Sequence, residues 1–142
     1  MLLSRSCEYA LQTLLYIAAQ PDGQYVLTRE IAEQRGLAYH FLSKVLQSLV
    51  KSRLLESQKG RGGGFALAKP ANEITLLEVI HAIEGPDFLD GCVLGLPRCD
   101  ASKPCPVHDQ WAGAKEKIHN MFADQTVAQL LDVARQREVK NG

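Results

Sequence analysis

The feature that most constrains the fold is an apolar stripe with helical spacing. It comprises Phe41, Leu42, Val45, Leu46, Leu49 and Val50. These intervals of three and four residues mark one face of an α-helix. The opposite face is polar and basic, and it comprises His40, Ser43, Lys44, Gln47, Ser48 and Lys51. Such a helix can bury one face and offer the other to a polyanion.

A second short helix precedes this stripe across a tight turn. We predict that Thr28 N-caps a helix over residues 29–34, with Ile31 and Ala32 inward, and that Gly36 ends it. Two short helices joined by a glycine turn, the second with a basic outer face, are typical of a helix-turn-helix that docks in the major groove of DNA.

The N-terminal segment predicts an amphipathic core helix over residues 4–19. Its inward face is expected to carry Leu11, Leu14, Leu15 and Ala18, and Cys7 is expected to be a buried small hydrophobic residue on the same helix. We favour this interpretation over a cleaved signal peptide, and we therefore expect a cytoplasmic protein without membrane spans.

A β-hairpin with a cationic loop follows the helices. Residues 54–58 and 65–68 read as strands, and residues 59–64 form a turn that carries Lys59 and Arg61 among glycines. A phosphate-cradling loop would open a helix, whereas this loop opens a strand. The pattern therefore favours the wing of a DNA-binding domain, with both cations within reach of phosphates.

The chain has no net charge, but its two halves differ. Residues 1–70 carry nine Lys or Arg and five Asp or Glu, whereas residues 71–142 carry seven and eleven. Residues 35–69 hold seven basic residues and one acid, Glu56. This concentration is the electrostatic footprint of a nucleic-acid-binding face, although a solvated surface would show it too.

A segment rich in glycine, proline and cysteine connects the two halves. Cys92, Cys99, Cys105 and His108 follow one another with six, five and two residues between them. Three thiolates and an imidazole are a plausible four-ligand metal set, and the wide spacing lets iron–sulfur ligation compete with structural zinc. Free surface thiols are the remaining interpretation.

Three further helices are predicted around this segment. A packing helix begins at Thr75 and ends at Gly85, and a last helix is capped by Thr126 with Leu130, Leu131 and Ala134 inward. Between them, an apolar seam comprises Trp111, Ala114, Ile118, Met121 and Phe122. The seam fits a partner helix or packing within the chain equally well.

Several motifs together resemble the bacterial winged-helix regulators of the iron–sulfur-cluster regulator and nitrite-sensitive repressor type. They are Tyr9-Ala10, Phe41-Leu42-x-Lys44-Val45-Leu46, Lys59-Gly60-x-x-Gly63-Gly64-Phe65-x-Leu67, Thr75-Leu76-x-Glu78-Val79-Ile80 and the cysteine trio with Cys105-x2-His108-x2-Trp111. The resemblance covers almost the whole chain.

The resemblance implies a homodimeric transcription factor, such as a repressor, that binds double-stranded operator DNA and an iron–sulfur cluster of the 2Fe–2S or 4Fe–4S type. Cys92, Cys99 and Cys105 would be ligands. The fourth ligand would be His108 or, as its rival, Glu8 of the partner's first helix. Candidate DNA-contacting residues are Arg29, Tyr39, His40, Ser43, Lys44, Gln47, Lys59 and Arg61.

The sequence departs from the family pattern at four places. Cys92 and Cys99 are one residue further apart than usual, and Ala38 stands where a proline often begins the recognition helix. Ser43 replaces a frequent acid at the base-reading position, and Lys59 replaces the wing arginine. Serine discriminates less between base edges than a carboxylate does, and lysine lacks the bidentate fork of arginine.

We therefore predict a mainly α fold with a small β-hairpin wing. It divides into a winged helix-turn-helix domain with its packing helix (1–84), a cysteine-rich loop (85–107) and a long dimerisation helix with a C-terminal helix (108–142). No nucleophile motif indicates an enzyme or a small-molecule substrate. The alternatives are a winged-helix regulator with zinc or thiol-oxidation sensing, and a small iron–sulfur electron-transfer protein.

Overall fold

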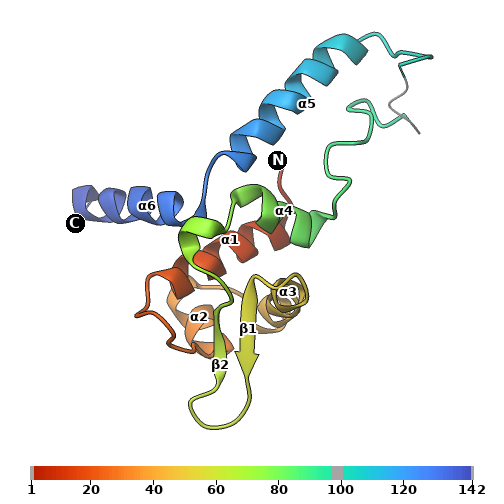
Figure 1. The fold of residues 1–142 in the computed structure, drawn as a ribbon. Helices are drawn as coiled ribbons and strands as arrows, with labels where there is room; N and C mark the ends of the chain where they lie inside the picture. Colours follow the sequence, from red (N-terminus) through yellow and green to blue (C-terminus); the bar gives the residue numbers. More distant parts are fainter. Residues whose placement is uncertain (1, 97–100, 142) are drawn as a thin grey trace.

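The computed structural model describes residues 2–96 and 101–141, and over these ranges the fold is mainly helical with one small hairpin (Figure 1). The elements are α1 (Arg5–Ala18), α2 (Thr28–Arg35), α3 (Tyr39–Lys51), β1 (Leu55–Gln58), β2 (Gly64–Leu67), the 3-10 turn η1 (Ala71–Glu73), α4 (Leu76–Glu84), α5 (His108–Ala123) and α6 (Val127–Asn141). This order confirms the predicted winged-helix fold class.

One hydrophobic core holds the N-terminal elements together. Helices α1 to α4 and the hairpin supply most of it, and its fully buried members include Leu14, Ile31, Leu42, Leu46, Leu49 and Val79. Burying each of these side chains stabilises the fold by about 1.5–3 kcal/mol before conformational entropy is counted. The core therefore fixes α3 and the hairpin as one rigid unit.

Helix α1 begins where the sequence predicts, and its buried face agrees with the prediction in part, at Cys7 and Leu14. Ser4 is the N-cap, and its Oγ accepts a hydrogen bond from the Cys7 amide at 3.1 Å. The fully buried residues of α1 include Cys7, Ala10, Thr13, Leu14 and Ile17, whereas the predicted Leu11, Leu15 and Ala18 are only half-buried. The face differs because α3, α4 and α6 cover α1 from several sides.

The helix-turn-helix forms as predicted except at its start. Thr28 is not the N-cap: α2 begins at Thr28, and the N-cap is Leu27, which offers no side-chain oxygen. The chain turns into α2 directly after Val26, which is held in a β-bridge. Gly36 ends α2 as predicted, with a left-handed φ of 66° and its N–H donated to the Ala32 carbonyl.

The apolar stripe of α3 is confirmed. Leu42, Val45, Leu46 and Leu49 are buried, and Phe41 and Val50 are half-buried against the core. The polar face of α3 therefore points outward, because these six residues occupy the side of the helix that packs against the core.

The hairpin is attached to the connection between α1 and α2. Within it, Leu55 pairs with Leu67 and Gln58 with Gly64. Val26 and Phe65 exchange two backbone hydrogen bonds of 2.8 Å, so the α1–α2 connection lies along β2 like a third strand. A Cβ at Gly64 would lie 2.4 Å from the Val26 carbonyl oxygen, so only glycine permits this approach.

Helix α4 begins directly after Thr75, where the sequence predicts its start, and Thr126 caps α6 as predicted. Thr75 and Glu78 form a full capping box on α4. On α6, the Thr126 hydroxyl accepts a hydrogen bond from the Gln129 amide at 3.2 Å. The amide of Val127 donates to the Ile74 carbonyl at 2.8 Å, which ties the start of α6 to the N-terminal unit. Leu130, Leu131 and Ala134 are half-buried.

Helix α5 differs from the others because it leaves the body of the molecule (Figure 1). None of its residues is buried, and Met121 is 53% exposed. Of the helices described, none is both long and apolar enough to cross a bilayer.

Candidate DNA-binding face and cysteine segment

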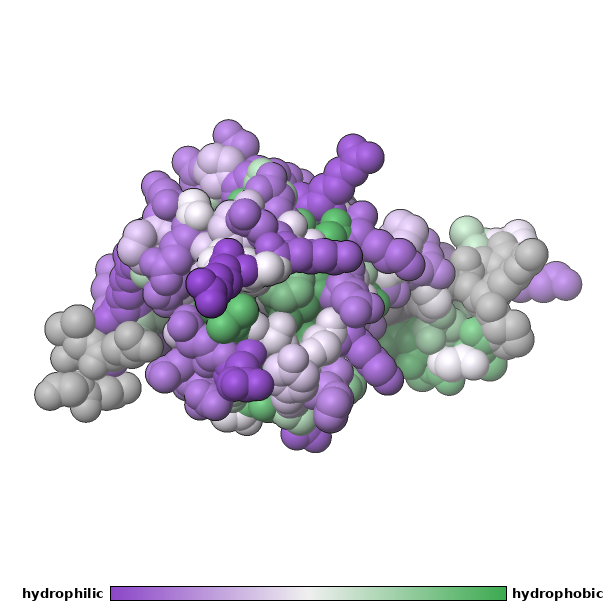
Figure 2. Space-filling view, turned by 90° about the horizontal axis from the view of Figure 1, so that it is seen from below, coloured by the Kyte–Doolittle hydropathy of each residue, from purple (hydrophilic) through white to green (hydrophobic). Residues whose placement is uncertain are grey.

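The outer face of α3 and the hairpin loop form one polar surface. Tyr39, His40, Lys44 and Gln47 are exposed, and Ser43 is half-exposed. The view from the side of the hairpin loop shows a predominantly hydrophilic surface (Figure 2). No acid lies in α3, so the charge that α3 brings to this surface is positive.

The hydroxyl of Ser43 is already engaged within its own helix. It donates a hydrogen bond to the Tyr39 carbonyl at 3.0 Å. In this rotamer the remaining lone pairs of Ser43 can only accept. That arrangement suits an exocyclic amino group of cytosine or adenine better than a carbonyl base edge.

The N-terminal end of α3 adds a second group of candidate contacts. Arg29, Tyr39 and His40 line one surface hollow between α2 and α3. The ring of Tyr39 meets that of His40 edge-on, with centroids 5.5 Å apart. The structure therefore brings together three of the residues that the sequence nominated.

The hairpin loop presents its cations from a tightly turned backbone. Lys59 and Arg61 are exposed, and Gly60 and Gly62 between and beside them have φ values of 87° and 70°. The Gly63 amide closes the turn on the Gly60 carbonyl at 3.0 Å. A loop of this kind can place a guanidinium and an ammonium group against phosphates.

Two of the three nominated cysteines lie side by side. The Cys92 thiol has a side-chain hydrogen bond with Cys105, and it also receives backbone hydrogen bonds. The backbone N–H groups of Leu94 and Leu96 lower the pKa of Cys92 most, and Cys105 and Gly95 add to the effect. Cys99 lies outside the described residues. Within those, no three His, Cys, Asp or Glu side chains form a metal-binding group.

Two local turns and the indole of Trp111 position the backbone around Cys92 and Cys105. The Gly95 amide donates to the Cys92 carbonyl at 2.9 Å, and the His108 amide donates to the Cys105 carbonyl at 3.1 Å. Trp111 Nε1 donates to the Gly91 carbonyl at 3.0 Å and so fastens the segment to α5. The sequence placed Trp111 in the apolar seam and in the Cys105-x2-His108-x2-Trp111 motif, without this hydrogen bond. Its polar indole N–H was the signal for this second role.

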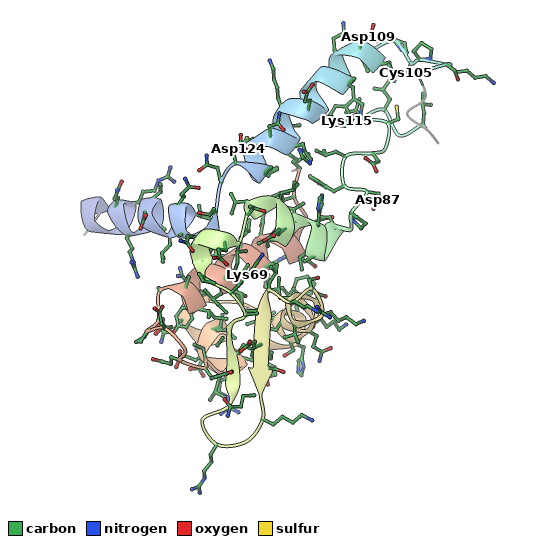
Figure 3. All side chains as sticks on the ribbon, viewed as in Figure 1. Lys69, Asp87, Cys105, Asp109, Lys115 and Asp124 are labelled. Atoms are coloured by element: carbon green, nitrogen blue, oxygen red, sulfur yellow. The ribbon has the colours of Figure 1, made fainter. Side chains whose placement is uncertain are left out.

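The cysteine pair is remote from the DNA-binding face of the same chain. Cys105 lies beside Asp109 at the outer end of α5, on the opposite side of the molecule from the hairpin loop (Figure 3). Val93, Leu94 and Leu96 beside Cys92 are 53%, 56% and 51% exposed. A group bound here would therefore lie far from the outer face of α3 and from the hairpin loop of the same chain.

Glu8 and Cys7 lie on α1, in the body of the molecule. Glu8 is half-buried, and within the described residues it forms no metal-binding group with Cys92 or Cys105. Cys7 is fully buried, and burial, Glu84 and Glu8 raise its pKa from 9.0 to about 11. This confirms the prediction that Cys7 is a structural residue, because a neutral buried thiol is a poor ligand.

Comparisons with known proteins establish the family. Residues 3–133 match the Rrf2 family, described as iron-dependent transcriptional regulators. This protein belongs to the Rrf2 family. It is therefore a transcriptional regulator of a DNA-binding family and not an enzyme, as the motifs and the resemblance predicted.

Individual relatives agree. A protein of Aquifex aeolicus whose name places it among HTH-type transcriptional regulators is 33% identical over 135 residues, covering 94% of this chain and 93% of its own. The regulator IscR of Serratia proteamaculans is 29% identical over 132 residues, or 93% of this chain and 80% of that protein.

Solved structures share the fold. CymR, the global cysteine regulator of Bacillus subtilis, superposes with a TM-score of 0.79 at 19% identity, covering 92% of this chain and 96% of CymR. The IscR of T. potens superposes with a TM-score of 0.73 at 22% identity, covering 93% and 87%. Both superpositions show that this chain shares the fold of these two regulators.

Proposed function

We propose that this Rrf2-family protein is a homodimer that binds operator DNA through α3 and the hairpin loop, and that an iron–sulfur cluster in the cysteine segment controls this binding. The observation that carries the DNA-binding half is the rigid, outward-facing polar side of α3 next to a cationic loop. Because the core locks both onto one unit, they can enter adjacent grooves together.

The sensing half rests on the pairing of Cys92 with Cys105. The donor set fits a cluster: two soft thiols are adjacent, backbone N–H groups point at one of them, and Cys99 lies between the two in sequence. His108 follows Cys105 by one turn and is the first choice as fourth ligand, with Glu8 of a second chain as its rival. When bound, the cluster would supply redox and nitric-oxide reactivity that the protein side chains lack.

Metal analysis of anaerobically purified protein tests this assignment. We expect iron and acid-labile sulfide in equal amounts, with visible absorption that changes in air. Cys92→Ala, Cys99→Ala and Cys105→Ala should each lose the cluster, whereas Cys7→Ala should retain it. A full cluster in any of the first three variants would refute the ligand assignment. His108→Ala and Glu8→Ala, compared by their spectra, identify the fourth ligand.

A second candidate is thiol or zinc sensing by the same segment. The contact between Cys92 and Cys105 favours it equally, because two thiols this close can also form a disulfide or share a zinc ion. Protein without iron after anaerobic reconstitution, together with zinc or a Cys92–Cys105 disulfide in a peptide map, would select this candidate. Family membership disfavours the electron-transfer alternative.

Dimerisation is proposed from the exposed seam of α5. Sixteen residues of helix with no buried side chain are unstable in isolation, since helices of that length depend on packing. A second copy of α5 would cover Ile118 and Met121 and would bring two α3 helices to successive half-sites.

A further inference from the structure

A tyrosine hydroxyl from α1 completes the N-terminal end of α3. Tyr9 is 7% exposed, and its hydroxyl accepts a hydrogen bond of 3.2 Å from the amide of Ala38. Ala38 is the N-cap of α3, and it has no side-chain oxygen to satisfy the free amides there. The partner therefore comes from a different helix, 29 residues earlier in the chain.

The same ring also fixes the first turn of α3 by packing. Tyr9 meets Phe41 edge-on, with ring centroids 4.9 Å apart and an interplanar angle of 90°. The hydrogen bond holds Ala38 and the ring contact holds Phe41, three residues further along, so together they define both the height and the rotation of α3 relative to α1. The candidate DNA-contacting residues Tyr39, His40 and Ser43 lie in the first two turns of this helix.

We propose that Tyr9 is the positioning residue that sets the register of α3 for base reading. Base contacts depend on the placement of a few side chains at the N-terminal end of a recognition helix, whereas phosphate contacts tolerate displacement. Loss of the Tyr9 hydroxyl should therefore weaken sequence-specific binding and spare non-specific binding. This inference rests on the proposed DNA-binding role of α3.

Helix α1 is also tied to the beginning of the cysteine segment. The Ser4 amide donates a hydrogen bond of 3.2 Å to Glu84 Oε1, and Glu84 is the last residue of α4, directly before that segment. One helix thus contacts both the recognition helix and the polypeptide that leads to the cysteines. A displacement of α1 would therefore move the N-terminal end of α3 through the contacts of Tyr9.

The test compares Tyr9→Phe with Tyr16→Phe in the full chain. Tyr16 is the matched control because it also lies in α1 but its hydroxyl donates to Glu30 of α2 at 2.8 Å and not to a group of α3. A binding duplex is first selected from random sequences with the wild-type protein. Affinities for that duplex and for a scrambled duplex are then measured, with thermal unfolding as the check on folding.

For Tyr9→Phe we expect the ratio of specific to non-specific affinity to fall roughly fivefold, the size of one neutral hydrogen bond. Faster amide exchange at Ala38 should accompany it. For Tyr16→Phe the ratio should stay unchanged. An unchanged ratio in Tyr9→Phe, or an equal fall in both variants, would overturn the role of Tyr9. If the wild-type protein selects no duplex, the proposed function itself fails.

Discussion

At the residue scale, one buried hydroxyl stands out. Thr13 is fully buried in α1, and among the described residues its Oγ1 has no hydrogen-bond partner. An unpaired buried hydroxyl costs about 1–3 kcal/mol. The hydrophobic periodicity of α1 does not reveal this, since a threonine on a helix surface leaves the same pattern.

We predict that Thr13→Val raises the free energy of unfolding by about 1 kcal/mol, because valine has the same shape without the hydroxyl. Urea denaturation measures it. The matched control is Thr75→Val, which deletes a hydroxyl that caps α4 and should lower stability by about 1 kcal/mol. A loss of stability in Thr13→Val would show that the hydroxyl has a partner in solution.

Cys7 gives the protein an alkaline stability limit. Because its pKa is raised from 9.0 to about 11, the folded state keeps a proton that the unfolded state releases between these values. Its contribution is complete below pH 9 and is lost as the pH rises toward 11. Between pH 9 and pH 11 the unfolding free energy of the wild-type protein should fall by on the order of 2 kcal/mol more than that of Cys7→Ala. Denaturation curves at pH 8, 9.5 and 11 decide it, and parallel curves for both proteins would contradict the assignment.

At the element scale, the sequence predicted helices and hairpin well because their signals are local. Spacing defined the buried side of α3, and the apolar residues that follow Thr75 defined α4. The N-cap of α2 was wrong and the face of α1 was right only in part, because non-local contacts decide them. Val26 pairs with a strand 39 positions later, and α6 returns to cover α1.

The candidate site was predictable in its residue types but not in its arrangement. Ligand spacing nominated Cys92 and Cys105, and only the folded segment shows that their thiols meet. The roles of Tyr9 and Trp111 could not be read from periodicity, because their polar atoms bond to backbone groups 29 and 20 residues away.

The hairpin loop supplies the next prediction. If Arg61 contacts phosphate, Arg61→Ala should weaken binding to the selected and the scrambled duplex by the same factor. The slope of log affinity against log salt concentration should become shallower by about 1. Fluorescence anisotropy over a salt series measures both. Arg135→Ala on the exposed surface of α6 is the control and should change neither quantity.

At the scale of the whole molecule, the proposed dimer would form through α5. Ile118→Glu places a charge in the apolar seam, and we expect it to convert a dimer into a monomer, since a buried unpaired charge costs several kcal/mol. Light scattering after gel filtration gives the mass. Glu116→Lys, on the opposite side of the same helix, should leave the dimer intact. Dimeric Ile118→Glu would mean that another surface joins the chains.

The pairing of Val26 with Phe65 has a consequence for engineering this protein. The connection between α1 and α2 is an exposed surface turn at residues 21–24, where a tag or a fusion domain would ordinarily be tolerated. Here the end of that turn is hydrogen-bonded to the hairpin that carries Lys59 and Arg61. An insertion at this turn would shift the hairpin and so displace Lys59 and Arg61, although it lies outside the loop that carries them.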